Sequence, residues 1–413
     1  MKILQINNCH YRRGGADVVY LNTGLLLEKM GHTVVHFSKT NNRNLPSAYE
    51  EYFLEDINFF PSNFWAKFKN IFRFLYSFEA KQKLGRLLKE TKPDIAHIHF
   101  YKGTLTPAIL AKLKKYGIPV IITLHDWGLL CPHNTFLDGK NNLCVRCINK
   151  SAVNCIIHKC NRNNLWYSII SALEFSIHKY FFPFQKYFDV LITVSEFGFK
   201  KHSLNKKYFE KLELLYNFYP ALKETTTSKV QGSYFLFYGR LSSEKGIITL
   251  INAWLLTKRK GVLKIVGEGP LFDKIASDAK RDQNCSIEVQ GYCDGDKLLT
   301  LIGDSSFVIV PSEWYENNPL TIIEAFALGK PVIGANIGGI PELIIDNENG
   351  FLFESRSVEE LSNAIAKAEK LNHSEYMRLS LAARQFALNN FEEAEHYDKL
   401  ISIYEKAIKN AKI

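Results

Sequence analysis

The sequence has few of the features that mark membrane-spanning, secreted or disordered chains. Among its 413 residues no stretch reaches the ~18 consecutive apolar residues of a spanning helix. Its start, MKILQINNC, lacks the apolar core of about 7 to 15 residues found in signal peptides. No low-complexity block indicates long disorder. We therefore expect a folded, cytoplasmic protein.

Length and charge suggest two unequal halves. The chain fits two domains of roughly 200 residues each, and two domains imply a cleft. Residues 1–215 hold 30 Lys and Arg against 16 Asp and Glu, whereas the remainder holds 22 against 26. The basic half is expected to meet something anionic, such as a lipid surface or a phosphorylated substrate; a merely solvated basic surface is the alternative. Nucleic acid is not expected, because no recognised binding motif accompanies the charge.

Strand and helix patterns alternate along the first half. The periodicity predicts a strand at Lys2 to Ile6, a helix at Ala16 to Lys29 and a strand at His32 to Phe37. Short apolar runs typical of buried parallel strands follow at Asp94 to His99, Pro119 to Leu124 and Val190 to Val194. This order predicts a doubly wound α/β domain.

A second domain of the same kind is predicted after a polar linker at Lys223 to Gly232. Its five predicted strands are Tyr234 to Tyr238, Leu263 to Val266, Ile287 to Gln290, Ser306 to Pro311 and Lys330 to Ala335. We assign residues 1–222 to an N-terminal domain with a cysteine-rich insertion at 131–160, and residues 223–393 to a second, C-terminal domain. Residues 394–413 form a final helix that could pack back on the N-terminal domain.

Two glycine-containing loops follow strands of the second domain. Gly239 is followed by Arg240 and Lys245, so that two cations lie between a strand end and a helix start, where they suit a diphosphate. Gly267 follows the next strand, where a glycine lets a base or phosphate approach the backbone; a plain turn is the alternative.

The most informative segment is VPSEWYENNPLTIIEAFALGKPVIGANIGGIPELI, residues 310–344. Asn318 is predicted to cap a helix that has Pro319 at its first position and Gly329 after its end. The positive end of this helix would stabilise an anion. Glu316 precedes the helix and Glu324 lies in its second turn, and carboxylates accept hydrogen bonds from groups such as sugar hydroxyls.

These motifs together resemble the family 4 glycosyltransferases. The resemblance rests on the Glu-x7-Glu pattern, the preceding GRL and KG, and the following GKPVI and GGIPE; it covers nearly the whole chain and is most specific over residues 236–353. It implies the GT-B fold, an α/β architecture of two Rossmann-like doubly wound domains facing across a cleft. In that fold residues 1–222 would form the acceptor-side domain and residues 223–393 the nucleotide-sugar-binding domain. An isolated Glu would more often be a surface carboxylate, but five linked elements in the expected order favour a binding site.

The resemblance also implies roles for residues of the second domain. Arg240 and Lys245 would neutralise the diphosphate, Glu324 would hold the ribose hydroxyls and Glu316 would contact the transferred sugar. The donor-binding set is completed by Gly239, Gly267, Asn318 and the N–H groups of Leu320 and Thr321. The commoner family pattern reads Glu-Pro-Phe-Gly, whereas this chain has Glu316-Asn317-Asn318-Pro319, which leaves the sugar open.

Two places in the first domain complete the predicted site. Gly14 and Gly15 precede a helix and would let a phosphate or an acceptor approach the backbone; they resemble the family's GG loop, with Asp17 where Glu is frequent. His125 follows the strand ending at Leu124 and resembles the family's cleft histidine, which binds the donor sugar near the reacting carbon. A lone histidine is more often structural, but this position favours function.

The predicted catalytic set is therefore His125, Glu316, Arg240 and Lys245. The bond to phosphate breaks with oxocarbenium character, and the cations oppose the charge on the departing diphosphate. No side-chain nucleophile is evident, so the resemblance favours retention by same-face attack, with no cofactor required. The acceptor would be a glycan or a lipid-linked precursor of cell-surface polysaccharide. A GT-B epimerase or hydrolase, and a non-catalytic GT-B partner subunit, are the alternatives.

Five of the eight cysteines lie close together in sequence. Cys144 and Cys147 have zinc-knuckle spacing, and His133 and His158 lie nearby as further ligands. Without a secretory signal disulfides are not expected. A structural zinc site is predicted, with reduced, metal-free cysteines as the alternative. Its candidate ligands are Cys131, Cys144, Cys147, Cys155 and Cys160.

Residues 64–89 mix aromatic and basic side chains at helical spacing. Phe64, Trp65, Phe68, Phe72 and Phe78 recur among seven Lys and Arg. This is typical of a helix at an anionic membrane surface, and it suits a protein that is peripheral at the inner face of the cell membrane. A core helix with a solvated face would explain the same periodicity.

Overall fold

The computed structural model describes residues 1–57, 64–225, 231–256, 261–281 and 286–411. The chain divides into two compact units, of which the first comprises Met1–Leu215 and Ala394–Ile413 and the second Tyr216–Glu393. The chain thus enters the second unit before the expected boundary at residue 222. The reason is that Tyr216 and Asn217 already bond within this unit, to Glu342 and Asn318. Residues 226–230 of the expected linker lie outside the described residues.

The first unit is built on a six-stranded parallel sheet in the order β2-β1-β3-β4-β5-β6. Its strands are short and mostly buried, as the apolar runs predict. They are β1 (Lys2–Ile6), β2 (Thr33–Phe37), β3 (Ile95–Ile98), β4 (Val120–Leu124), β5 (Val190–Thr193) and β6 (Leu212–Leu214). Sequence periodicity missed β6, because a three-residue edge strand containing Glu213 carries too little apolar pattern.

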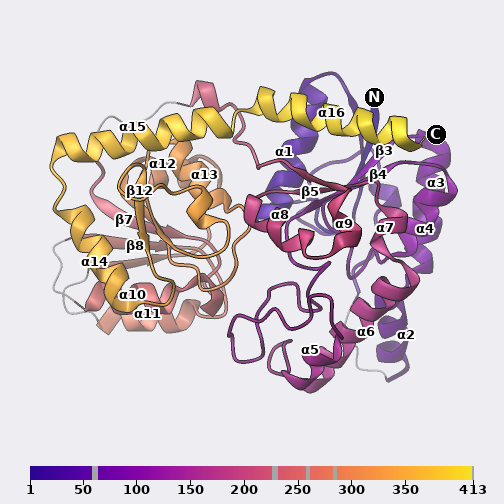
Figure 1. Cartoon of the computed structure of the whole chain (residues 1–413), viewed down its shortest axis with the longest axis horizontal. Helices are drawn as coiled ribbons and strands as arrows, with labels where there is room; N and C mark the ends of the chain where they lie inside the picture. The colour runs from indigo at the N-terminus through magenta and orange to yellow at the C-terminus, as the bar shows by residue number, and fades with distance from the viewer. Residues whose placement is uncertain (58–63, 226–230, 257–260, 282–285, 412–413) are drawn as a thin grey trace. The chain divides into compact units, whose positions relative to one another are not determined.

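Ten helices and one 3-10 turn of the described residues belong largely to this unit. They are α1 (Gly15–Lys29), η1 (Glu50–Tyr52), α2 (Phe64–Leu75), α3 (Phe78–Thr91), α4 (Ala108–Lys115), α5 (Val153–Ile157), α6 (Leu165–Phe181), α7 (Phe184–Tyr187), α8 (Glu196–Ser203), α9 (Lys206–Phe209) and α16 (Glu393–Ala411). Between β4 and α5 the chain runs through an irregular segment, which Figure 1 shows as loops beside α5 and α6.

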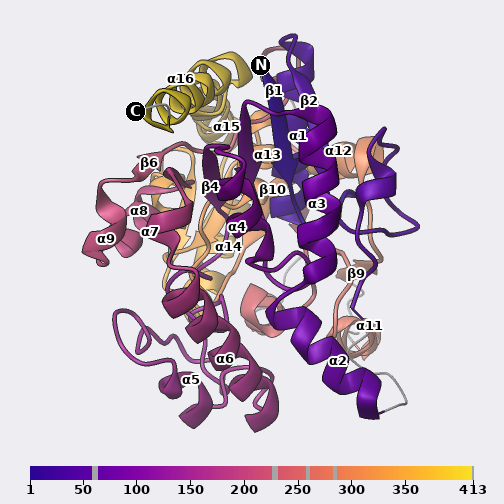
Figure 2. The same ribbon diagram turned by 90° about the vertical axis from the view of Figure 1, so that its right-hand side faces the viewer.

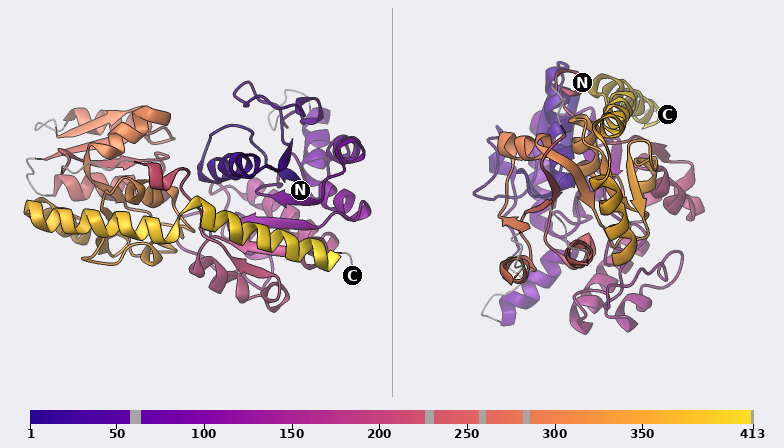
Figure 3. Two further views of the ribbon diagram at one scale, coloured as in Figure 1. Left: turned by 90° about the horizontal axis from the view of Figure 1, so that it is seen from above. Right: turned by 90° about the vertical axis from the view of Figure 1, so that its left-hand side faces the viewer.

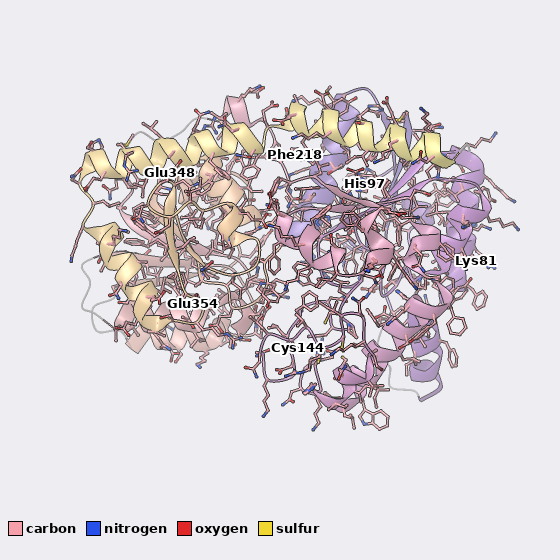
Figure 4. The ribbon with its side chains drawn as sticks, viewed as in Figure 1. Lys81, His97, Cys144, Phe218, Glu348 and Glu354 are labelled. Atoms are coloured by element: carbon pink, nitrogen blue, oxygen red, sulfur yellow. The ribbon has the colours of Figure 1, made fainter. Side chains whose placement is uncertain are left out.

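The C-terminal helix α16 completes the core of the first unit. Leu400, Tyr404 and Ala407 are buried against strand residues such as Ile95 and Ile121. The hydroxyl of Tyr404 also lies 2.7 Å from Nδ1 of His97 on β3. Figure 3 shows the helix lying along the sheet, and Figure 4 labels His97 beneath it. Each large buried side chain contributes about 1.5 to 3 kcal/mol, so this helix is an integral layer of the unit.

The second unit has another six-stranded parallel sheet, in the order β12-β11-β10-β7-β8-β9. Counted from its first strand this is the 3-2-1-4-5-6 order of doubly wound dinucleotide-binding folds. The strands are β7 (Tyr234–Tyr238), β8 (Val262–Val266), β9 (Ile287–Gln290), β10 (Ser305–Val310), β11 (Val332–Ala335) and β12 (Gly350–Phe353). The predicted doubly wound architecture is confirmed in both units, although the edge strand β12 was not predicted.

Helices cover both faces of the second sheet. Figure 1 shows α12, α13 and α15 over one face and α10, α11 and α14 over the other. The elements are η2 (Leu222–Glu224), η3 (Ser243–Lys245), α10 (Ile247–Leu255), α11 (Phe272–Arg281), α12 (Gly295–Gly303), α13 (Leu320–Ala327), η4 (Ile340–Glu342), α14 (Val358–Glu369) and α15 (His373–Asn390). Both layers close a continuous core in which Trp254, Phe307 and Phe326 are fully buried. Within the described residues, no helix is both long enough and apolar enough to cross a membrane.

Candidate active site

The topology of the second sheet places one pair of loops at a ligand-binding position. Strand order reverses between the neighbouring strands β7 and β10. Open α/β sheets bind ligands beside the carboxyl ends of their strands at such a switch point. The loop after β7 carries Arg240 and Lys245, and the loop after β10 carries Glu316. The fold therefore brings together two segments about 70 residues apart that the sequence had singled out separately.

Glu316 and Lys245 form a direct ion pair in this place. Lys245 Nζ donates to Glu316 Oε1 at 2.7 Å, and the same oxygen accepts from Ser312 Oγ and Trp314 Nε1, each at 2.8 Å. Glu316 is buried, and burial alone would raise the pKa of its carboxyl; the charge of Lys245 and the hydrogen bonds outweigh burial and lower the pKa. At neutral pH the pair is therefore a fixed anion beside a partly exposed cation.

The GGIPE motif, residues 338–342, holds the backbone of Glu316 in place. Gly339 N–H donates to the carbonyl of Glu316 at 2.8 Å. Gly338 has φ of 63°, and a Cβ there would lie 2.4 Å from the same carbonyl oxygen. Only a glycine permits this contact, because both the backbone conformation and the space exclude a side chain. The motif thus positions the backbone of Glu316.

The two glycine loops after β7 and β8 also pack on each other. Gly239 N–H donates to the carbonyl of Val266 at 3.0 Å, and a Cβ on Gly267 would lie 1.9 Å from the carbonyl of Gly239. Gly267 is therefore required for close backbone packing in this loop pair. That requirement is independent of any bound base or phosphate.

The N-terminus of α13 differs from the sequence prediction. The helix begins at Leu320 with Pro319 as its N-cap residue, so the prediction of Asn318 as the cap was wrong. The physical reason is a competing partner, because Asn318 Oδ1 accepts instead from the backbone N–H of Asn217 at 3.0 Å. Among the described residues, the buried Nδ2 of Asn318 has no hydrogen-bond partner. This donor and the first N–H groups of α13 remain for an anion or a hydroxyl-bearing ligand.

Glu324 lies one turn further along α13 and contacts a tyrosine. The buried hydroxyl of Tyr238, the last residue of β7, donates to Glu324 Oε2 and to the carbonyl of Thr321, each at 2.9 Å. Burial raises the pKa of Tyr238 well above its ordinary value, and the charge of Glu324 raises it further. The tyrosine therefore stays a neutral donor that orients the carboxylate.

Arg240 is exposed, in contrast to the buried Glu316. Its guanidinium pairs with Glu244, whose Oε1 also accepts from Ser242 Oγ at 2.8 Å. This ion pair lies within one loop and 58% of the arginine side chain is exposed. An exposed pair of this kind contributes little to stability, so Arg240 can turn to another anion at small cost.

In the first unit, His125 is part of a buried histidine group at the ends of β3 and β4. His125 Nε2 lies 3.0 Å from His99 Nδ1, and the two rings stack at 5.3 Å. Burial lowers the pKa of His125 to about 4 and that of His99 well below its ordinary value. Both imidazoles are therefore neutral at pH 7. They line a small cavity together with Lys102 and Asp126.

The predicted glycine loop lies at the start of α1. Gly14 is the N-cap residue and Gly15 the first residue of the helix. Gly14 has an ordinary extended φ, and a Cβ there would meet only Asp17 Oδ2, at 3.9 Å. The glycines therefore leave open space before the helix N-terminus. Asp17 accepts from Asn7 Nδ2 at 2.8 Å, and burial raises the pKa of its carboxyl.

Several residues that shape these sites carried no sequence signal. In the second unit they are Ser312, Trp314 and Tyr238, and in the first unit His99 and Tyr20, whose rings meet edge to face at 5.5 Å. Ser312 and Trp314 lie in the loop after β10, Tyr238 and His99 lie at strand ends, and Tyr20 lies within α1, each with an ordinary local sequence pattern. Only the pairing of neighbouring strands reveals their proximity.

Comparisons with known proteins agree with this arrangement. A family model described as Glycosyltransferase Family 4 matches residues 13–219, and one described as Glycosyl transferases group 1 matches residues 219–386. An uncharacterized 42.6 kDa protein in the cps region of Klebsiella pneumoniae is 27% identical over 83% of this chain and 87% of its own length. The lipopolysaccharide 1,2-N-acetylglucosaminetransferase of Salmonella typhimurium is 31% identical over 33% of this chain and 40% of its own length.

Solved structures show the same fold. The sucrose-phosphate synthase of Thermosynechococcus elongatus has a TM-score of 0.70 at 17% identity, with 99% of each chain covered. HepE of Anabaena, in complex with UDP, has a TM-score of 0.66 at 15% identity, with 98% of this chain and 100% of that chain covered. These likenesses show the GT-B fold with its two Rossmann-like domains.

Proposed function

The chain belongs to glycosyltransferase family 4, and we propose that it transfers a sugar, with retention of anomeric configuration, from a nucleoside-diphosphate sugar to a glycan or lipid-linked acceptor. That the protein is a glycosyltransferase follows from its family. The donor class, the stereochemistry and the acceptor are the proposal. The observation that carries the donor assignment is the Lys245–Glu316 pair at the switch point of the second sheet, next to the N-terminus of α13.

The groups around this pair suit a nucleoside diphosphate. Lys245, Arg240 and the first N–H groups of α13 supply positive charge and hydrogen-bond donors for phosphate oxygens. Glu324, oriented by Tyr238, supplies acceptors for a pair of ribose hydroxyls. Glu316 faces the transferred sugar in this proposal, and its negative charge stabilises the positive charge that develops on the anomeric carbon.

Retention is supported by the chemistry of the described side chains. At the switch point Glu316 is already bound by Lys245, Ser312 and Trp314, and such a carboxylate is a poor nucleophile. We therefore propose same-face attack, in which the departing phosphate oxygen takes the proton of the acceptor hydroxyl. Lys245 and Arg240 stabilise the charge on that diphosphate. His125, neutral at pH 7, provides a hydrogen bond to the donor sugar rather than a proton.

A role in cell-surface polysaccharide synthesis is supported by two relatives. One is encoded in a cps region, and the other is named as a lipopolysaccharide N-acetylglucosaminetransferase. Neither name fixes the sugar that this chain transfers. The substitution of Asn317-Asn318-Pro319 in the glutamate loop lies beside the proposed sugar position, so it is expected to affect sugar selection.

Calorimetric titration of the full chain with UDP-glucose, GDP-mannose and ADP-glucose tests the donor site. One of these is expected to bind, and Arg240→Ala should weaken its binding at least tenfold without changing the binding of the matching nucleoside. Arg378→Ala is a matched control, because Arg378 is an exposed arginine on α15 that donates to the carbonyl of Asn347. An equal loss of donor affinity in Arg240→Ala and Arg378→Ala would contradict the proposal that Arg240 binds the diphosphate.

Proton NMR of the product tests the stereochemistry. The anomeric coupling of the transferred sugar should match that of the donor, and an inverted product would exclude same-face transfer. Incubation with donor alone separates the alternative of a hydrolase or epimerase. Turnover without an acceptor as fast as turnover with one would favour that alternative.

We further propose that the first unit docks on an anionic membrane surface. Trp166, Leu173 and Tyr180 recur every seven residues along α6 and are all exposed, as is Ile157 on the neighbouring α5. Phe72 on α2 is also exposed, and the rings of Tyr76 and Phe182 stack where the ends of α2 and α6 meet. Figure 2 shows α2 and α6 projecting in the same direction. Side chains 64–69 of the predicted amphipathic stretch lie outside the described residues.

Charge supports this choice of partner. Residues 64–89 carry seven Lys and Arg against one acid, and residues 150–186 carry five against one, the buried Glu174. Apolar side chains among basic ones are typical of interfacial segments. We expect the chain to sediment with vesicles of equal phosphatidylglycerol and phosphatidylcholine, and the double variant Trp166→Ser, Tyr180→Ser to stay in the supernatant. Tyr292→Ser, which alters an exposed tyrosine of the second unit, is the control. Equal sedimentation of all three proteins would contradict the proposed surface.

A further inference from the structure

The chain enters the second unit through a segment that bonds to the glutamate loop of the donor site. Tyr216 is the first residue of this unit, and Asn217 follows it. Asn217 donates twice to Asn318: its backbone N–H to Oδ1 at 3.0 Å, and its side-chain Nδ2 to the carbonyl oxygen at 3.1 Å. Both asparagines are buried, and Figure 4 labels the next residue, Phe218. The two residues form a two-point contact, here called the asparagine clamp.

The acceptors in the asparagine clamp are the two atoms that Asn318 would use as a helix cap. The side-chain oxygen of a capping residue accepts from the second or third N–H group of its helix, and its carbonyl accepts the first intrahelical bond. With Asn318 as the cap, those N–H groups belong to Leu320 and Thr321, and the carbonyl would accept from Ile322. In the structure both acceptors are turned to Asn217 instead.

The backbone at the start of α13 agrees with this competition. Pro319 has φ of −67° and ψ of 118°, so it is extended and the helix begins one residue later, at Leu320. The N–H of Ile322 donates to the carbonyl of Pro319 at 3.1 Å, rather than to that of Asn318. A proline side chain has no oxygen that could cap the helix. The N–H groups of Leu320 and Thr321, the first two of α13, therefore have no intrahelical partner.

The asparagine clamp also fixes the orientation of the Asn318 amide. Its Oδ1 faces the N–H of Asn217, and the opposite orientation would place two donors against each other. The other end of the amide, Nδ2, is a donor and cannot accept from the N–H groups of α13. Among the described residues this buried Nδ2 has no hydrogen-bond partner. In this orientation the amide takes no N–H group of the helix away from a ligand.

We propose that Asn217 is a positioning residue of the donor site: it holds Asn318 away from α13, so that the N–H groups of Leu320 and Thr321 stay open for the diphosphate of the donor. This role rests on the proposed function, in which the nucleoside diphosphate lies at this helix end. Without the asparagine clamp, Asn318 Oδ1 and a phosphate oxygen would compete for the same N–H groups. The clamp removes that internal competitor before the ligand binds.

Amide hydrogen exchange of the ligand-free chain, resolved at single residues, tests the clamp without any donor. In the unmutated chain Leu320 and Thr321 should exchange at least about tenfold faster than Ile322, whose N–H is bonded. Asn217→Ala frees the Asn318 carbonyl, so Asn318 should then cap the helix. The first two amides should exchange about fivefold more slowly, the factor that corresponds to an asparagine cap of ~1 kcal/mol.

Two further variants complete the exchange experiment. The double variant Asn217→Ala, Asn318→Ala should return Leu320 and Thr321 to fast exchange, because alanine cannot cap a helix. Asn349→Ala is the matched control: Asn349 is a buried asparagine of the same unit, and its Nδ2 donates to the carbonyl of Leu343 at 3.0 Å. Its loss should leave the exchange of the first two amides of α13 unchanged.

Calorimetric titration with UDP, GDP and ADP, each beside its nucleoside, tests the link to the donor. The diphosphate that binds the unmutated chain should bind Asn217→Ala about fivefold more weakly. The matching nucleoside should bind both proteins alike. The double variant Asn217→Ala, Asn318→Ala should bind the diphosphate more tightly than Asn217→Ala does. A merely structural contact predicts the reverse, since a second lost side chain would weaken binding further.

Each contrary result has a separate meaning. Unchanged or faster exchange of Leu320 and Thr321 in Asn217→Ala would overturn the proposal, because loss of a packing contact only loosens the helix end. Slower exchange with unchanged diphosphate affinity would overturn the link to the donor. If UDP, GDP and ADP all fail to bind the unmutated chain, the proposed donor site and the role of Asn217 in it both fall, whatever the exchange shows. Slow exchange of these amides in the unmutated chain would contradict the proposal even if Asn217→Ala does not fold.

Discussion

The Lys245–Glu316 pair predicts an asymmetry between its two members. Only 9% of the Glu316 side chain is exposed, against 26% of Lys245. Removing the lysine leaves a buried carboxylate without its counter-charge, whereas removing the carboxylate leaves a lysine that water can reach. Breaking a buried pair costs about 3 to 5 kcal/mol. Because Ser312 and Trp314 still donate to Glu316, we expect Lys245→Met to lower the free energy of unfolding by about 3 kcal/mol, at the lower end of that range.

The double variant Lys245→Met, Glu316→Gln should be more stable than Lys245→Met alone. The glutamine is neutral and its oxygen can still accept from Ser312 and Trp314. Replacing an unpaired buried charge by such a group should recover about 2 kcal/mol. Lys399→Met is the control, because Lys399 pairs at 2.7 Å with Glu395 and both side chains are more than half exposed. Loss of such a surface pair should cost less than about 1 kcal/mol.

The pH dependence provides a second measurement on the same variants. In the wild type the pKa of Glu316 lies below its ordinary value of 4.5, so the stability from the pair is present above that pH and is lost on acidification. In Lys245→Met, burial should raise the pKa of Glu316, so the variant gains stability as the pH falls. The difference in free energy of unfolding between the wild type and Lys245→Met should therefore shrink from pH 7 towards pH 4.5.

The assay is urea unfolding followed by tryptophan fluorescence, with hydrogen exchange of residues 311–328 to localise the effect. Two results would refute the reasoning. One is a stability difference that is the same at pH 7 and pH 4.5. The other is a double variant no more stable than Lys245→Met.

Two further predictions concern backbone fit and acid stability. Gly338→Ala should destabilise the second unit by more than about 2 kcal/mol, because it adds a Cβ 2.4 Å from the Glu316 carbonyl oxygen at a position with positive φ. Gly303→Ala is the control: Gly303 has open space around it, so the substitution should be neutral or stabilising by about 0.4 to 1 kcal/mol. Equal melting temperatures for the two variants would contradict this expectation. Burial lowers the pKa of His97 to about 3 and that of His125 to about 4, so these histidines take up protons only when the first unit unfolds. Below pH ~6.5 each of them should therefore lower the free energy of unfolding by about 1.4 kcal/mol per pH unit. Hydrogen exchange between pH 6.5 and 5, corrected for intrinsic rates, should show the first unit opening before the second; the reverse order would be inconsistent with this reasoning.

Much of the fold could be predicted from the sequence, because buried parallel strands leave short apolar runs between helical patterns. The ten predicted strands are present, and the two missed ones, β6 and β12, are short edge strands. The boundary between the two units was harder to predict from the sequence. The polar run at 223–232 resembles a linker, but the partners of Tyr216 and Asn217 lie more than 100 residues away in sequence.

The candidate site could be predicted as a set of positions but not as a set of contacts. The spacing of Glu316 and Glu324 pointed to a helix N-terminus, yet it could not show that Glu316 binds Lys245 or that Glu324 binds Tyr238. Capping preference also failed at Asn318, because a tertiary partner, the backbone of Asn217, outcompeted the local helix. Such contacts depend on which strands are neighbours, and local sequence does not encode that.

The return of α16 to the first unit has a consequence for biosynthesis. During translation Met1–Leu215 leaves the ribosome long before α16, the helix that covers Ile95 and Ile121, is synthesised. Domains generally fold as units during synthesis, the N-terminal one first. Here the N-terminal half must wait, with an apolar face of its sheet uncovered, until translation has passed through the entire second half. Completion of the first unit therefore reports that translation has passed the second unit, Tyr216–Glu393.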